Sequence, residues 1–328
     1  MDADLPADLR RGLEQLTQGR SHRALAQRAT ALSQRYRAGG RSADAIRDQD
    51  DALAYALTRL PATYAAVAAA LSAVARARPA FAPRTMVDVG AGPGTAAWVA
   101  AQRFPAIADV RLIDDNAPAR ALARALLAAS DHPALRKAAY AAGALTDSRG
   151  EPADLVVASY LIGELAPDAL ADAADGLWSR AANVLLVVEP GTPAGFLRIS
   201  ALRARLIGRG AHVVAPCPHD AACPIAAPDW CHFAQRLARS RGHQRVKGAA
   251  LAFEDEKFSY VALAREPGAR IDARVLAHPR VSKAGIVMKL CTADGIATET
   301  TARRDRAPYK ARTRWRWGDA VADTEGEA

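Results

Sequence analysis

Three of the chain's four cysteines lie in one short segment, PCPHDAACPIAAPDWCHF at positions 216–233. The four are Cys217, Cys223, Cys231 and Cys291. Four thiolates suffice for a tetrahedral zinc site or an iron–sulfur cluster, and disulfides are rare inside cells. The tight C-x2-C spacing that is usual in zinc sites is absent. The wide spacing and the two Cys-Pro pairs therefore favour an iron–sulfur cluster. A zinc site, with His219 or His232 as substitute ligands, and unliganded thiols are the alternatives.

A second group of residues has the pattern of a nucleotide-binding loop. The segment VDVGAGPGT, residues 87–95, places Gly90, Gly92 and Gly94 after an apolar run and before a helical one. Glycines let the backbone turn tightly against a ligand, and the N-terminus of the next helix offers free N–H groups. Asp114 follows about twenty residues later, where a carboxylate accepts hydrogen bonds from ribose hydroxyls.

The exact glycine spacing separates two kinds of cofactor. A dinucleotide fingerprint reads G-x-G-x-x-G, whereas this loop reads G-x-G-x-G and is preceded by Asp88. That form resembles motif I of S-adenosylmethionine-dependent methyltransferases. The resemblance implies that Asp88 helps to hold the loop and the methionine end of the cofactor, and that Asp114 holds the ribose. A loop that keeps the fold but binds nothing is the alternative.

The chemistry that would follow cofactor binding is not encoded clearly. The segment SYLIGEL, Ser159–Leu165, stands where amino-group methyltransferases often carry an Asn-Pro-Pro-Tyr-like tetrad, and it does not match. No cysteine nucleophile for carbon-5 methylation of pyrimidines lies near it. Tyr160 and Glu164 are the polar residues expected to face the pocket, and no catalytic base is assigned. Whether the protein is an enzyme therefore stays open.

Positive charge is the third chemical feature of the chain. Lys and Arg number 44 against 35 Asp and Glu, a net charge of +9, and only six of the cations are lysines. A general bias toward Ala and Arg would also raise this charge, so placement matters. Two basic stretches, QRLARSRGHQRVKG and ARRDRAPYKARTRWRW, suggest contact with RNA phosphates, and Tyr309, Trp315 and Trp317 are candidates for base stacking. The arginines expected to bind RNA are Arg236, Arg239, Arg312, Arg314 and Arg316.

The elements that must position these residues alternate in type along the chain. Residues 1–80 show apolar spacing of three and four, which predicts helices, one of them across RGLEQLTQGRSHRALAQRATALSQRYRAGGR. From residue 84, apolar strands alternate with helices, which is typical of a parallel sheet covered on both faces. Short alternating strands follow, including YKARTRWRW. We predict an α/β fold with a helical region at 1–80, a core at 81–268 and a β-rich basic region at 269–328.

The cysteine segment, with KFSYVALAR, KLCTADG and the terminal RWRWGD, resembles the methyltransferase-like assembly-factor family of the mitochondrial small ribosomal subunit, which has bacterial members. The resemblance runs from the glycine loop to Gly318. It implies a Rossmann-like S-adenosylmethionine-dependent methyltransferase fold and association with small-subunit ribosomal RNA during assembly. It also implies that the four cysteines hold a 4Fe–4S cluster, which would join the segment 216–233 to the strand that carries Cys291.

The leading prediction is thus a small-subunit assembly factor that binds S-adenosylmethionine, a 4Fe–4S cluster and ribosomal RNA. The alternatives are an active ribosomal RNA methyltransferase and a redox- or iron-sensing regulator that binds RNA. The start MDADLPADLR lacks the apolar core of a signal peptide, and the longest apolar or small run, Ala65–Ala75, is too short to span a bilayer. We expect a cytoplasmic protein without a membrane segment, monomeric when it is off the ribosome.

Overall fold

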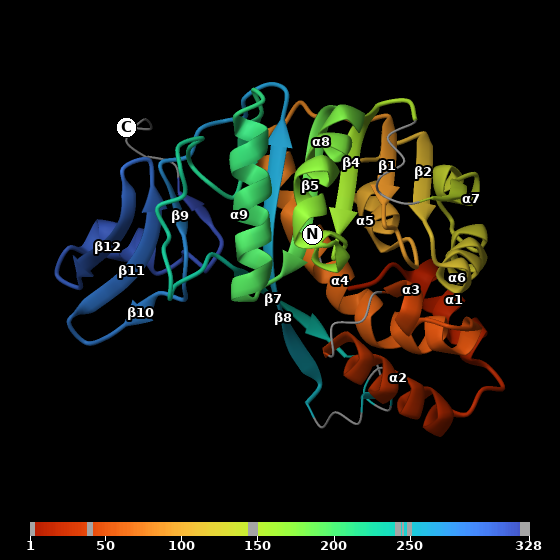
Figure 1. Ribbon diagram of the computed structural model, residues 1–328. Helices are drawn as coiled ribbons and strands as arrows, with labels where there is room; N and C mark the ends of the chain where they lie inside the picture. The colour runs from red at the N-terminus through yellow and green to blue at the C-terminus, as the bar shows by residue number, and fades with distance from the viewer. Residues whose placement is uncertain are drawn as a thin grey trace.

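A computed structural model of the chain describes residues 4–37, 42–143, 150–239, 244, 246–247 and 251–321 (Figure 1). Two sheets organise this part of the chain. The strands of the larger sheet are β1 (Thr85–Val89), β2 (Asp109–Asp114), β3 (Ala139–Ala142), β4 (Ala153–Ser159), β5 (Ala181–Pro190), β6 (His212–Ala215), β7 (Phe233–Ala238) and β8 (Phe253–Ala264). Those of the smaller sheet are β9 (Ala273–Val275), β10 (Arg280–Val281), β11 (Gly285–Thr292), β12 (Gly295–Ala302) and β13 (Ala320–Val321).

The larger sheet has the order β3-β2-β1-β4-β5-β8-β6, and β7 also pairs with β8. Strands β1 to β5 pair in parallel, whereas β8 runs antiparallel to β5, β6 and β7. The parallel part is a doubly wound sheet whose order reverses between β1 and β4. Ligands of such sheets bind at that reversal, beyond the carboxyl ends of the strands. The predicted α/β Rossmann-like fold with a small β-rich C-terminal appendage is confirmed.

Helices cover both faces of the larger sheet (Figure 1). Along β5, Leu186 and Val188 belong to a core shared with the N-terminal helices, whereas Leu185 and Val187 belong to a core shared with the helices around β5. This alternation follows from the two-residue period of a strand. The first face carries α1 (Ala7–Thr17), α2 (His22–Arg37), α4 (Gln49–Ala77), α5 (Thr95–Arg103) and α6 (Ala117–Ala128). The second carries α8 (Leu170–Arg180) and α9 (Pro193–Ile207).

Short helices complete the described chain. They are α3 (Ser42–Ala45), α7 (Pro133–Arg136), α11 (Arg306–Arg312) and the 3-10 turns η1 (Ile162–Glu164) and η2 (Pro167–Ala169). Helix α4 is long and apolar enough to cross a membrane, but 78% of its apolar window is buried inside the protein. Its apolar composition is explained by its contacts with α5, α6 and β8.

Two expectations about local structure are wrong. The amphipathic stretch before residue 40 forms two helices, α1 and α2, because Gly19 has a φ of +75° and turns the chain between them. The segment YKARTRWRW, expected to be a strand, begins in helix α11 and continues as turns. Tyr309 of α11 and Trp315 pack on the core of the smaller sheet. Their spacing in the sequence therefore reflects a helix and turns rather than one face of a strand. The boundaries predicted at residues 80 and 268 stay predictions, although the N-terminal helices share a core with the larger sheet.

Candidate functional site

The glycine loop lies at the carboxyl end of β1, at the point where the strand order reverses. Gly90, Gly92 and Gly94 all have positive φ, of 67°, 52° and 78°. Gly94 is the N-cap of α5, and a Cβ at Gly90 would lie 2.6 Å from the Leu161 side chain. A Cβ at Gly92 would meet no atom within 4 Å. Gly92 therefore faces open space that a side chain would enter.

Asp114, at the end of β2, holds this loop in place. Its Oδ2 accepts a hydrogen bond from the Gly92 N–H at 2.8 Å, and its Oδ1 accepts one from the Asn116 N–H at 2.8 Å. The hydroxyl of Tyr140 donates to the Gly92 carbonyl oxygen at 2.6 Å. Burial raises the pKa of Asp114, and the two backbone N–H groups oppose that rise. Because a carboxylate accepts about four hydrogen bonds, Asp114 keeps capacity for a ligand hydroxyl.

A cavity of about 220 Å³ joins these residues to the N-terminal helices. Ile46, before α4, and Tyr55, on α4, form part of its wall, and the Asn116 side chain donates to the Ile46 carbonyl oxygen at 2.9 Å. Tyr160 and Glu164 line the cavity from the segment after β4, as the sequence predicted. The contributions of Ile46, Tyr55 and Asn116 were missed. Asn116 stands directly before an apolar helix with Pro at its second position, which is an N-cap pattern that indicates where α6 begins.

Tyr160 is held in an unusual backbone conformation. Its φ is +57°, and among the described residues it is the only non-glycine residue with positive φ. The Tyr160 hydroxyl donates to Oε1 of Glu256 at 2.9 Å, and Arg59 forms an ion pair with the same oxygen at 2.9 Å. Backbone strain of this kind persists only where surrounding contacts enforce it, and it is concentrated at functional sites. The network fixes the tyrosine ring beside the glycine-loop cavity.

Asp88 lies beneath the loop and is fully buried. Burial raises its pKa to about 8, and the charge of Asp114 adds to this rise, while the Ala97 N–H opposes it. An acid whose pKa is higher in the folded protein than its ordinary value of 3.8 binds more protons when folded. The folded state therefore loses stability as pH rises through the window from about 4 to 8, at most about 1.4 kcal/mol per pH unit.

We expect Asp88→Asn to remove this loss, so that the Tm of the variant exceeds that of the unchanged protein by an amount that grows from pH 5 to pH 9. Thermal unfolding across that range is the measurement. Asp109→Asn, at an exposed carboxylate that begins β2, is the matched control and should give a smaller difference. A Tm difference for Asp88→Asn that does not change with pH contradicts the expectation.

The four cysteines converge although they come from both halves of the C-terminal region. Together with His219 they line a cavity of about 30 Å³ between the segment that follows β6 and strand β11. The Cys291 Sγ lies 3.9 Å from Nε2 of His219. Burial and the neighbouring thiols raise the pKa of Cys231, and they raise that of Cys291 to about 12. Within the described ranges, no three or more His, Cys, Asp or Glu side chains form an arrangement able to hold a metal ion.

Two buried arginines flank the cysteine cavity. Arg203 donates to the His219 carbonyl oxygen at 2.7 Å and lowers the pKa of Cys217, although burial raises it overall. Arg274, on β9, donates to the carbonyl oxygens of Pro216 at 2.7 Å and Gly318 at 2.8 Å. These cations favour thiolates, and they fasten the segment 216–233 between the two sheets. Fixed positive charge beside the four thiols lowers the cost of ionising them.

The arginines expected to bind RNA differ in what they contact. Arg239 is paired with Glu254 at 2.7 Å and is largely buried, while Arg312 is paired with Glu299 at 2.7 Å. Arg236 pairs with Asp255 at 2.8 Å but its side chain is 64% exposed. Arg314 and Arg316 are exposed. Two of the five are thus engaged inside the protein, and two neighbouring cations of the first basic stretch, Arg241 and Arg245, lie outside the described residues.

The aromatic residues named with these arginines pack against the protein. The indole N–H of Trp317 donates to the His232 carbonyl oxygen at 3.0 Å, and its ring contacts those of His232 and His278. Tyr309 and Trp315 pack on the smaller sheet. All three rings are half-buried, and their stacking on bases stays a prediction.

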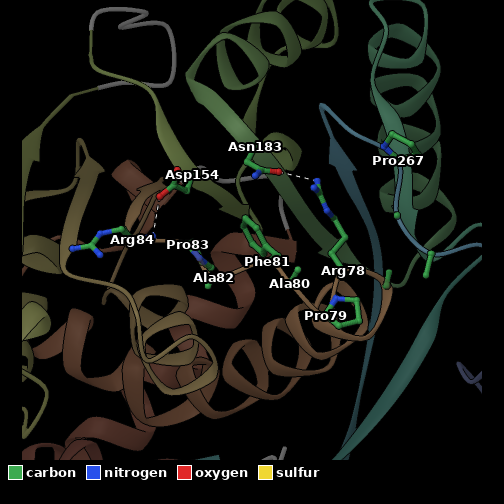
Figure 2. Close-up of a pocket in the computed structure, with 13 residues that line it drawn as sticks. Arg78, Pro79, Ala80, Phe81, Ala82, Pro83, Arg84, Asp154, Asn183 and Pro267 are labelled. Carbon is green, nitrogen blue, oxygen red and sulfur yellow. Dashed lines mark hydrogen bonds between the residues drawn. The ribbon is translucent and has the colours of Figure 1, made fainter.

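A third hollow, of about 480 Å³, lies at the opposite edge of the larger sheet, near the amino ends of β1, β4 and β5 (Figure 2). Three of its polar side chains, those of Arg78, Asn183 and Asp154, have partners. Arg78 donates to Oδ1 of Asn183 at 2.7 Å, and Asp154 accepts from the Arg84 N–H at 2.8 Å. Nothing in this lining resembles a reactive site.

Comparison with known proteins places these features in a family. Residues 49–322 match the family model described as mitochondrial small ribosomal subunit Rsm22. The human mitochondrial ribosome assembly protein METTL17 is 29% identical over 292 residues, which cover 82% of this chain and 62% of that protein. The mitochondrial Rsm22-cox11 tandem protein 2 of Schizosaccharomyces pombe is 26% identical over 222 residues, covering 54% of this chain and 27% of that protein. The chain thus spans less than two thirds of the length of either relative.

Solved structures of methyltransferases overlap only loosely. Magnesium protoporphyrin IX methyltransferase of Synechocystis PCC 6803 with bound SAM is 14% identical, with a TM-score of 0.38 over 62% of this chain and 78% of that chain. The plantazolicin methyltransferase BpumL in complex with SAH is 12% identical, with a TM-score of 0.43 over 75% of this chain and 98% of that chain. The Rossmann-like methyltransferase fold of this chain is instead assigned from its strand order and its glycine loop.

Proposed function

This chain belongs to the family of the mitochondrial small ribosomal subunit protein Rsm22, and from that membership we propose that it is a small-ribosomal-subunit assembly factor. In this proposal it binds S-adenosylmethionine at the glycine loop, a 4Fe–4S cluster at the four cysteines, and ribosomal RNA through its C-terminal region. The observation that carries the proposal is the family match across residues 49–322, which includes all three features. Localisation in the cytoplasm and a monomeric state off the ribosome are further predictions.

Cofactor binding is supported by the fit of the glycine-loop cavity. Gly92 leaves a cradle that a Cβ would fill, and Asp114 keeps lone pairs toward the cavity. Asp88 is buried below the glycine loop, and its carboxyl group interacts with the Ala97 N–H of α5, the helix that follows the loop. S-adenosylmethionine supplies an activated methyl group when it is bound. The residues of this chain would hold its ribose and orient its methionine end.

We expect Gly92→Arg to abolish binding of S-adenosylmethionine while the fold survives, because the new side chain enters the cavity instead of the core. Isothermal titration calorimetry measures the binding. Gly210→Arg is the matched control, since Gly210 also has positive φ (81°) and no atom within 4 Å of a Cβ, yet it follows α9 far from the loop. Equal affinity of the two variants contradicts this role for the glycine loop.

Cluster binding is supported by the convergence of four thiols and the buried Arg203 on one cavity, with the buried Arg274 near enough to act on Cys217. Cluster ligands must be deprotonated, so the cations beside Cys217 favour the bound state. The cluster would join the segment 216–233 to β11, and so join the two sheets. The segment has little apolar core of its own, which makes it dependent on such a bond.

Contact with RNA is supported by an exposed group of cations around α11. They are Arg303, Arg304, Arg306, Lys310, Arg314 and Arg316. Arginine binds phosphate through two parallel hydrogen bonds, and this group lies on the same small sheet that the cysteines fasten to the core. The cysteine cavity and the basic group therefore belong to one structural unit.

Sedimentation of the purified protein with small-subunit precursor particles tests the assembly role. We propose that association persists in Gly92→Arg, because the assembly role depends on docking rather than on methyl transfer. Absence of the protein from the small-subunit fractions contradicts the proposal. Loss of association in Gly92→Arg, but not in Gly210→Arg, would make the cofactor part of docking.

A second candidate function is methyl transfer to RNA. It is favoured by a larger cavity that shares Tyr55, Tyr160 and Glu164 with the glycine-loop cavity, so that a methyl acceptor would have space beside the cofactor. Transfer of labelled methyl groups to precursor ribosomal RNA, lost in Gly92→Arg, would establish it.

A further inference from the structure

The segment that follows β4 contains the 3-10 turn η1 and forms one wall of the glycine-loop cavity. Tyr160, Leu161 and Glu164 of this segment line that cavity. Leu161 packs directly on the glycine loop, since a Cβ at Gly90 would lie 2.6 Å from its side chain. The shape of the cavity therefore depends on where this turn is held.

The turn cannot satisfy its own first N–H groups. As in every helical turn, these groups have no acceptor inside the turn. The residue at the N-cap is Leu161, whose side chain cannot accept a hydrogen bond. The carboxyl group of Glu189, in the neighbouring strand β5, interacts instead with the N–H groups of Ile162 and Gly163, which stabilise its ionised form. Glu189 thus anchors the start of the turn.

Gly163 allows this close approach. A Cβ at Gly163 would lie 2.8 Å from Oε2 of Glu189, nearer than a side-chain carbon can come, and 3.4 Å from Nη1 of Arg198. The φ of Gly163 is not positive, so its backbone conformation does not require glycine. The glycine is explained by the contact between the turn and the buried carboxyl group.

The charge of Glu189 is finely balanced. The residue is 0% exposed, and this burial raises its pKa to about 7. The charge of Glu164 adds to the rise in pKa, whereas the N–H groups of Gly163 and Ile162 and the charge of Arg198 on α9 oppose it. Among the described residues, neither oxygen makes a hydrogen bond of ordinary geometry, so these contacts offset the burial only in part. An ionised carboxyl group offers two acceptor oxygens to the turn, and protonation turns one of them into a donor.

We propose that Glu189 is a positioning residue, whose ionised carboxyl group holds the turn Ile162–Glu164 and thereby keeps the glycine-loop cavity in the shape that receives the cofactor. The proposal rests on the proposed function in taking S-adenosylmethionine as the ligand of that cavity. Both oxygens of Glu189 are buried, so it acts on the ligand through the turn and not by contact. When Glu189 is protonated, the turn loses an acceptor, and the wall that carries Tyr160 and Leu161 loosens.

The first measurement is an NMR titration of the full chain, labelled at its glycine amides, from pH 5.5 to pH 8. Gly163→Ala identifies the Gly163 resonance by its absence. We expect this resonance to shift with a midpoint at about pH 7, because its N–H group interacts with the carboxyl group that titrates there. Glu189→Gln should abolish the shift, since the amide keeps the size and one acceptor but does not titrate. Glu266→Gln, at an exposed carboxylate, is the control and should keep the shift.

The second measurement is the affinity for S-adenosylmethionine at pH 8 and pH 6, by calorimetry. We expect the affinity to fall by about three- to tenfold between these values, since about nine tenths of a group is protonated one unit below its pKa. In Glu189→Gln the affinity should already be low at pH 8 and should fall less than about twofold further because of the turn. Asp88 and Asp114 also titrate near the loop, but both proteins contain them, so their effect cancels in the comparison. Gly163→Ala, whose Cβ displaces the carboxyl group, should lower the affinity at pH 8 as Glu189→Gln does.

A Gly163 resonance that does not titrate, or that titrates equally in Glu189→Gln, overturns the proposal. The same holds if the affinities of the unchanged protein and of Glu189→Gln are equal at pH 8 and fall equally toward pH 6; in that case the cofactor site stands and the positioning role is wrong. Failure of the proposed function gives a different result. If no protein binds S-adenosylmethionine at either pH, the cofactor site itself is wrong, and the Gly163 resonance alone decides whether Glu189 holds the turn.

Discussion

If the proposed cluster is bound, replacing Cys231 with serine is expected to strip iron from the protein and to lower its Tm by about 5 °C. The Cys231 thiol interacts electrostatically with the other three thiols, and all four line one cavity. A structural metal site contributes roughly 10 kcal/mol of folding free energy, and in a chain of 328 residues 1 kcal/mol corresponds to about 1.5 °C of Tm. Loss of only a third of that free energy gives the expected fall. Iron content and differential scanning calorimetry, both on protein purified without oxygen, measure the effect.

The position of the fourth cysteine makes this prediction specific. Cys291 lies on β11 of the smaller sheet, whereas Cys231 precedes β7 of the larger one. Cys291→Ser should therefore match Cys231→Ser in both iron loss and Tm. Thr292→Ser, one residue further along β11, keeps the hydroxyl that donates to the Gly295 carbonyl oxygen and should change neither quantity. Full iron content in either cysteine variant, or iron loss without a fall in Tm, contradicts a cluster that joins the sheets.

Replacing Arg314 and Arg316 together with alanine is expected to weaken binding to small-subunit ribosomal RNA by on the order of tenfold and to flatten its salt dependence. Each lost contact with a single-stranded phosphate lowers the slope of log affinity against log salt by about 0.7, so the pair should lower it by about 1.4. Both side chains are exposed, so their removal takes no contact from the core. Titrations of labelled RNA at several salt concentrations measure both quantities.

The control for this prediction removes the same charge elsewhere. Arg10 of α1 and Arg23 of α2 are exposed on the N-terminal helices. If local contacts at α11 matter, replacing these two with alanine should change the affinity by less than about threefold. An equal effect of the two double variants would mean that only net charge attracts the RNA, and it would remove α11 from the account.

The sequence predicted the parallel sheet well because its strands are nearly continuous apolar runs. In β4 and β5 both faces are buried, and the helices between them keep the spacing of an amphipathic helix. The glycine loop could also be predicted from the sequence. Its three positive-φ positions require glycine, so the loop appears as glycines at a fixed spacing. Family resemblance named the cysteines as ligands, and the structure brings them to one cavity.

Local patterns failed where tertiary contacts decide the outcome. The sequence of the N-terminal region predicted only helices. Tyr55 and Ile46 nevertheless line the glycine-loop cavity, because α4 packs across the sheet. The sequence predicted that Arg239 is a surface cation free to bind RNA, but it forms an ion pair with Glu254 on the neighbouring strand. Glu189 stands in an apolar run, VLLVVEPG, and nothing in that run indicates that its carboxyl group is fully buried against the backbone of Gly163.

Crosslinking the protein to RNA by ultraviolet light in its own cells, followed by sequencing of the attached RNA, tests the assembly role most directly. We expect small-subunit ribosomal RNA to dominate the recovered sequences and crosslinks to fall when Arg314 and Arg316 are replaced. Recovery mainly of messenger or transfer RNA, or of no RNA above the background of an uncrosslinked sample, would contradict it.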